Sequence, residues 1–81
     1  MEVFPNPFND DLSVKLEIGK TDNVEFKLFN ELGSLVNQWS FEKQPAGEHS
    51  FQLDVNVPTG VYFLQVQMGE NLITKRVVRM R

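Results

Sequence analysis

The run Gly60-Val61-Tyr62-Phe63-Leu64-Gln65-Val66-Gln67-Met68 is the longest one rich in β-branched and aromatic residues with turn-forming residues on both sides. Pro58-Thr59 precedes it and Gly69-Glu70-Asn71 follows it. Such a run between turn signals is typical of a strand. Alternation places on one face only apolar groups and a phenol, from Tyr62, Leu64, Val66 and Met68. We therefore predict a central strand of a small sheet over residues 60–68.

Alternating apolar and polar residues predict further strands at 12–18, 24–28 and 51–55, a weaker one at 35–41, and a last one at 72–79. In the weaker strand, Leu35, Trp39 and Phe41 would share a face. Gly33 is placed to take a positive φ in a hairpin with a bulge. Spacings near 10–12 residues without a helical period predict an all-β fold, an immunoglobulin-like antiparallel β-sandwich of about seven short strands. We expect residues 1–81 to form a single domain.

Composition excludes several functions. The net charge of −3 argues against a nucleic-acid surface, and the absence of Cys excludes disulfides and thiolate metal sites. The chain is small for a catalytic cleft of roughly 300 Å³ or more. It has one histidine, His49, and no Gly-x-Ser-x-Gly motif. Asn9-Asp10-Asp11 could offer oxygens to Ca²⁺, but adjacent side chains on an extended chain cannot all face one ion. We therefore expect no enzyme, cofactor, metal or small-molecule substrate.

Two features leave alternatives open. Trp39 with Tyr62 or an exposed phenylalanine could form a platform for sugar rings, although core packing is the commoner role for such residues. Four of the eight basic residues lie in the last seven positions: Lys75, Arg76, Arg79 and Arg81. They would either keep a solvated last strand from edge pairing or form a charged docking strip for a partner.

Four motifs, in order along almost the whole chain, resemble the type IX secretion system C-terminal sorting domain, type A. This family is also called the Por secretion system sorting domain. The motifs are the opening Phe4-Pro5-Asn6-Pro7-Phe8-Asn9-Asp10, the Phe29–Val36 turn region with Gly33, the Pro58–Leu64 segment with its Gly-x-Tyr signature, and the basic-apolar ending Thr74–Arg79. Ser34 departs from the pattern, because a basic or amide residue is frequent there.

The resemblance implies a secretion signal at the C-terminus of a larger protein exported by Gram-negative Bacteroidota. Such a cargo crosses the inner membrane by its own N-terminal signal and passes through the periplasm. The outer-membrane type IX translocon then reads the C-terminal domain, which a sortase-like peptidase usually removes. The cargo ends at the cell surface or outside the cell. The resemblance thus implies that this chain was excised from a larger secreted protein.

We expect the hairpin of residues 60–68 and 72–79 to be the recognised element. Recognition would combine backbone pairing at an exposed strand edge with contacts from charged side chains. The expected partner-binding residues are Gly60, Tyr62, Lys75, Arg76, Val77, Val78 and Arg79. A second set, Pro5, Asn6, Pro7 and Gly33, is expected to act structurally, and Gly60 would also help to form the turns. The alternative function is a carbohydrate-binding or immunoglobulin-like spacer module, and an exposed edge could pair or exchange strands with a second copy.

Overall fold

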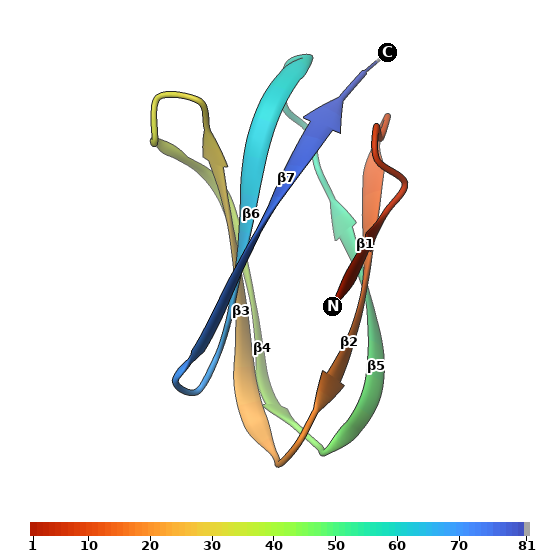
Figure 1. The fold of residues 1–81 in the computed structure, drawn as a ribbon, viewed down its shortest axis with the longest axis vertical. Coiled ribbons are helices and arrows are strands. Elements are labelled where there is room, and N and C mark those ends of the chain that lie inside the picture. The colour runs from red at the N-terminus through yellow and green to blue at the C-terminus, as the bar shows by residue number, and fades with distance from the viewer. Residues whose placement is uncertain (81) are drawn as a thin grey trace.

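Seven strands and no helix make up residues 1–80, the part of the chain that the computed structural model describes (Figure 1). The strands are β1 (Glu2–Phe4), β2 (Asp11–Ile18), β3 (Asp22–Asn30), β4 (Leu35–Gln44), β5 (Gly47–Asp54), β6 (Gly60–Met68) and β7 (Asn71–Arg79). The all-β prediction is confirmed. The periodicity did not predict β1, because three residues are too few to show alternation.

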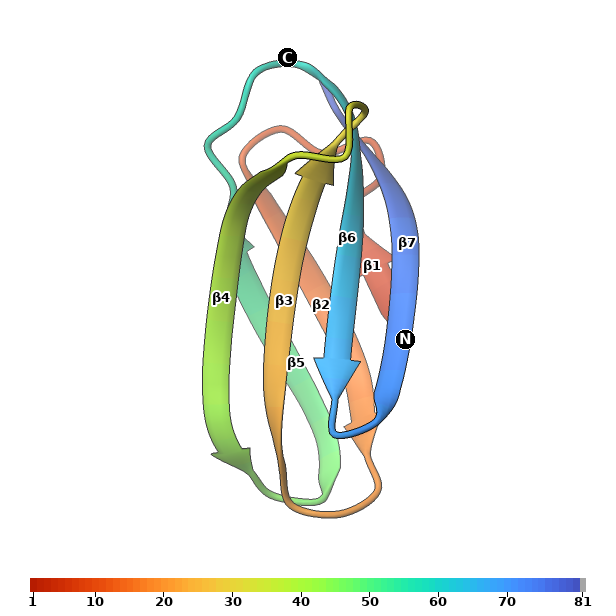
Figure 2. The same cartoon turned by 90° about the vertical axis from the view of Figure 1, so that its left-hand side faces the viewer.

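The strands form two antiparallel sheets that pack face to face (Figure 2). One sheet has the order β1-β2-β5 and the other the order β4-β3-β6-β7. These orders correspond to strands A, B and E and strands C′, C, F and G of an immunoglobulin-like sandwich. The predicted fold class is therefore confirmed, and β6 is a central strand between β3 and β7. Within residues 1–80, no helix is long and apolar enough to span a membrane.

The core lies between the two sheets and consists of the inward members of each alternating pattern. On β6 these are Tyr62, Leu64 and Val66, each less than a tenth exposed. No polar or charged residue is buried among residues 1–80. Burying an aliphatic or aromatic side chain of this kind contributes about 1.5–3 kcal/mol. The two sheets are therefore held together by apolar packing and not by a buried polar network.

The β3–β4 hairpin contains the predicted bulge. Leu28 pairs with Asn37 but the next residue, Phe29, pairs with Leu35, so Val36 is the extra residue on β4. An extra residue reverses the alternation that follows. Leu35 consequently shares the outer face with Phe29 and is 47% exposed, whereas Trp39 and Phe41 pack against the core. The expectation that Leu35 shares a face with Trp39 and Phe41 was wrong, because alternation alone does not show at which residue a bulge falls.

Candidate functional site

The β6–β7 hairpin divides the predicted partner-binding residues between two environments. Inward-facing Tyr62 and Val77 are buried at 6% and 0% exposure. Their side chains can affect a partner only through the shape of the hairpin. Lys75 and Arg76 are exposed, and Val78 and Gly60 are half-buried. No ion pair within residues 1–80 includes Lys75 or Arg76. Arg81, the fourth basic residue of the predicted strip, lies outside the described residues.

The segment after β1 lies along the outer edge of β7 (Figure 1). The Asn6 side chain donates a hydrogen bond from Nδ2 to the carbonyl of Arg76 (3.1 Å) and accepts one at Oδ1 from the N–H of Val78 (3.0 Å). The backbone of Phe8 then donates to the carbonyl of Val78 (2.9 Å) and accepts from the N–H of Met80 (2.8 Å). Asn6 and Phe8 together thus take the place of a neighbouring strand.

This arrangement brings together two motifs that lie about seventy residues apart in the sequence. Asn6 was predicted to be structural, and its contacts now define what it does: it covers the C-terminal part of the β7 edge. Pro5 and Pro7 flank it, and the peptide bonds before both prolines are cis. Phe8 is 1% exposed and fixes the segment in the core. Periodicity alone does not predict that Phe8 is buried, since an isolated aromatic in an irregular segment gives no periodic signal.

The N-terminal part of the β7 edge is open. In an antiparallel strand, alternate residues direct both backbone groups to the same side. Val78 directs its N–H and carbonyl away from β6, and Thr74 and Leu72, which lie two and three steps of two earlier on the same strand, do the same. No strand pairs with β7 on that side within residues 1–80. The backbone groups of Leu72 and Thr74 are therefore free to pair with another chain.

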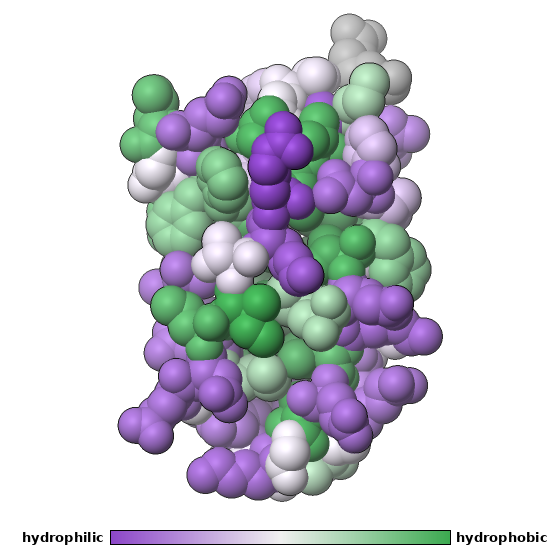
Figure 3. All heavy atoms as spheres, viewed as in Figure 1, coloured by the Kyte–Doolittle hydropathy of each residue, from purple (hydrophilic) through white to green (hydrophobic). Residues whose placement is uncertain are grey.

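A hollow of about 510 Å³ lies beside this open edge, between β1 and β7. It is lined by Met1, Glu2, Val3, Phe4, Asn6, Lys75 and Arg76. Figure 3 views the molecule from this side and shows apolar and strongly hydrophilic side chains next to each other. The hollow is therefore lined by apolar and charged residues of β1 and by Lys75 and Arg76 of β7.

Arg79 differs from the other two basic residues of β7. Its Nη2 lies 3.5 Å from Oδ1 of Asp10, and its side chain is only 18% exposed. Its Nε is buried without a hydrogen-bond partner in the structure. The guanidinium thus ties the end of β7 to the segment that follows Phe8. Its predicted role in partner binding stays a prediction, but Lys75 and Arg76 are the cations that a partner can reach directly.

Tyr62 fixes the start of β6 in the manner of the tyrosine corner of immunoglobulin-like domains. Its hydroxyl donates a hydrogen bond of 2.6 Å to the carbonyl of Pro58, four residues upstream. Gly33 has φ of 82°, as predicted for the β3–β4 turn. Gly60, by contrast, is not among the residues with positive φ, and an added Cβ would only touch the Tyr62 ring at 3.7 Å. The expectation that Gly60 supplies turn flexibility was therefore wrong.

The aromatic residues and the histidine that could have formed other sites make contacts within the domain. Trp39 packs against the core and Tyr62 is buried, so these two rings do not form an exposed platform. The Nε2 of His49 lies 2.6 Å from the carbonyl oxygen of Pro45, and its ring stacks on Phe51. No group of three or more His, Cys, Asp or Glu side chains in residues 1–80 is arranged to hold a metal ion.

A comparison with protein families supports the resemblance noted from the motifs. The family model described as the secretion system C-terminal sorting domain matches residues 2–80. No protein of curated function and no solved structure matched the chain. The matched range includes both the Asn6 segment and the β7 edge that it covers.

Proposed function

This chain belongs to the secretion system C-terminal sorting domain family, and on that basis we propose that the type IX machinery recognises the open edge of β7. Membership makes the chain a C-terminal sorting signal that interacts with the type IX secretion machinery. It also implies export across the envelope to the cell surface or outside. The family description does not name the surface that is recognised.

The observation that supports this surface is that the β7 edge is covered along one half and open along the other. Asn6 and Phe8 occupy the outward backbone groups from the Arg76 carbonyl onward. Leu72 and Thr74 precede that point and have free outward groups. An extended segment of the partner would pair with them as an added strand. Each backbone hydrogen bond gained in this way contributes about 0.5–1.5 kcal/mol net.

The exposed cations would select the partner. Lys75 and Arg76 line the hollow next to the open edge, so carboxylates on the added segment would meet them there. Complementary charges mainly raise the association rate and exclude wrong partners. The half-buried Arg79, paired with Asp10, would hold the edge in shape and contribute less to direct contact.

We also propose the finer steps that the family resemblance implies. The cargo would pass through the periplasm, and the partner would be the outer-membrane translocon of a Bacteroidota host. A sortase-like peptidase would then remove residues 1–81 as a single domain of the larger secreted protein. The domain would itself be non-enzymatic, and as an isolated fragment it could pair with a second copy through the same open edge.

Charge reversal at the edge tests the proposal without removing a strand. The cargo would carry Lys75→Glu with Arg76→Glu in a type IX-competent strain. The matched control is Lys20→Glu with Lys43→Glu, which changes two exposed lysines elsewhere by the same net charge. We expect surface delivery to fall about tenfold for the edge pair, corresponding to about 1.4 kcal/mol of lost binding. The control pair should deliver the cargo as the unmodified protein does.

Thermal unfolding of the purified variants checks that the fold is retained, since exposed substitutions usually change stability by less than about 0.5 kcal/mol. Deleting residues 72–81 would be less informative, because it removes Val77 from the core as well as the open edge. Equal delivery of the edge pair and the control pair would refute recognition through β7.

A further inference from the structure

The outer face of the four-stranded sheet carries an apolar row that crosses all four strands. Leu35 on β4 pairs with Phe29 on β3, and Phe29 pairs with Phe63 on β6. Phe63 in turn pairs with Arg76 on β7. Directly paired residues share a face of the sheet, so this row runs from an aliphatic side chain through two aromatic rings to a cation. Figure 2 presents this face with its four strands side by side.

The neighbouring row extends the apolar surface. Val61 pairs with Val78, and both are half-buried. We name the set Phe29, Leu35, Val61, Phe63 and Val78 the apolar half of the outer face. Leu32, in the adjoining turn, is 90% exposed. These side chains face away from the core, so packing between the sheets does not account for them.

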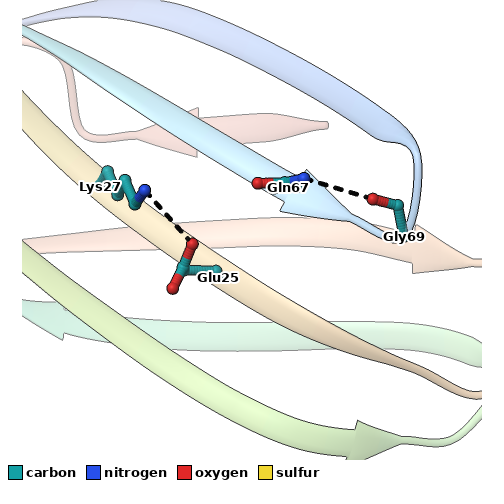
Figure 4. Close-up of polar contacts among 4 residues, drawn as sticks. All are labelled: Glu25, Lys27, Gln67 and Gly69. Carbon is teal, nitrogen blue, oxygen red and sulfur yellow. Dashed lines mark hydrogen bonds and ion pairs between the residues drawn. The ribbon is translucent and has the colours of Figure 1, made fainter.

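The other half of the same face is polar. Lys27 pairs with Gln65, and Glu25 pairs with Gln67. Lys27 Nζ lies 3.6 Å from Glu25 Oε1, and Gln67 Nε2 donates to the carbonyl of Gly69 over 3.4 Å (Figure 4). A solvated sheet face normally carries polar side chains such as these. One half of the face therefore follows the rule for a solvated surface, and the apolar half does not.

The chemistry of the row restricts what can cover it. Aromatic residues and arginine are enriched at the centres of protein interfaces, and contiguous exposed apolar patches mark interaction sites. A surface that covers Phe63 also removes water from its neighbour Arg76. Burying an unpaired guanidinium is costly, so a stable partner must place a carboxylate opposite it. Within residues 1–80 no carboxylate forms an ion pair with Arg76.

We propose that the apolar half of the outer face docks a protein of the secretion machinery whose contact surface presents apolar side chains around a carboxylate that meets Arg76. This inference rests on the proposed recognition of β7 by that machinery. Arg76 belongs to both surfaces, because it lines the hollow beside the open edge and pairs with the outward-facing Phe63. The secretion machinery would then contact the domain both at the open edge of β7 and on the outer face of the four-stranded sheet.

Site-specific photocrosslinking in the complete cargo tests the two surfaces separately. A benzophenone amino acid replaces Phe63 to report on the apolar half, Phe4 to report on the hollow beside the open edge, or Gln67 to report on the polar half. Each version is expressed in a type IX-competent strain and in the same strain lacking the outer-membrane translocon. We expect translocon-dependent adducts with a machinery component, identified by mass spectrometry, from positions 63 and 4 and not from position 67.

The dependence on Arg76 tests the predicted carboxylate. Arg76→Glu should lower the adduct from position 63 about tenfold, while Arg76→Lys, which keeps the charge, should retain most of it. An adduct from position 4 without one from position 63 would overturn this inference and leave the edge proposal standing. Adducts from neither position would overturn both. An adduct of two copies of this chain at position 63, equal yields from 63 and 67, or no effect of Arg76→Glu would also overturn the inference.

Discussion

Replacing Asn6 by alanine is the most direct test of how the first motif stabilises the last strand. The change removes the side-chain donor to the Arg76 carbonyl and the side-chain acceptor from the Val78 N–H. It leaves the two backbone hydrogen bonds of Phe8 to Val78 and Met80 in place. The apolar core is untouched, because Asn6 is exposed. The variant therefore isolates the contribution of one side chain to the covering of the β7 edge.

The expected cost follows from the two lost hydrogen bonds. Each contributes about 0.5–1.5 kcal/mol net, giving about 1–3 kcal/mol together. Water can reach both freed groups on β7, so we expect the lower part of that range, about 1–2 kcal/mol. For a domain of this size each kcal/mol lowers Tm by about 4–8 °C. Thermal unfolding followed by circular dichroism should therefore show a decrease of about 5–15 °C.

Amide hydrogen exchange gives the local readout. The N–H of Val78 loses its acceptor in the Asn6→Ala variant and should exchange markedly faster, while amides in the centre of β6 should change only with global stability. Asn9→Ala is the matched control, because Asn9 is exposed and its side chain makes none of the hydrogen bonds found in residues 1–80. If Asn6→Ala and Asn9→Ala share the same Tm and the same Val78 exchange rate, the edge-covering role of Asn6 is wrong.

Two further predictions concern the turns around β6 and β4. Tyr62→Phe removes a hydroxyl that donates to the Pro58 carbonyl, and denaturant unfolding should show a loss of about 1–3 kcal/mol; unchanged stability would contradict the tyrosine-corner assignment. Gly33→Ala should lower the free energy of unfolding by about 1–2 kcal/mol, because φ is 82° at this position. Gly60→Ala should be nearly neutral, because Gly60 is not among the residues with positive φ and the nearest atom would lie 3.7 Å from an added Cβ. A larger loss for Gly60→Ala than for Gly33→Ala would show that the turn geometry has been misassigned.

Periodicity identified most of the fold because each long strand has one face in the core and one in water. Residues 12–18 and 60–68 show this alternation, and they became β2 and β6. Two features of the fold could not be predicted from this alternation. The three residues of β1 are too short for a pattern, and the extra Val36 on β4 reverses the pattern that Leu35 would otherwise follow.

The candidate site was only partly predictable. The sequence showed how many basic residues the last strand has, but it did not show which of them are buried or paired. Arg79 is half-buried against Asp10, whereas Lys75 and Arg76 are exposed beside the hollow. Motif resemblance marked Pro5, Asn6 and Pro7 as structural, but it did not show what Asn6 contacts. That role needed the contacts of Asn6 with β7, which no local pattern contains.

The order of apolar and polar residues by itself determined that this chain is a two-sheet sandwich with β6 inside one sheet. Burial of alternating side chains is a local property, and a strand displays it wherever it packs. Only the tertiary structure decided which part of β7 is covered and which part is open, because hydrogen bonds between Asn6 and Val78 join residues 72 positions apart. Such hydrogen bonds form only when the packed sheets bring the segment after β1 next to the edge of β7. Local periodicity in the sequence carries no information about that proximity.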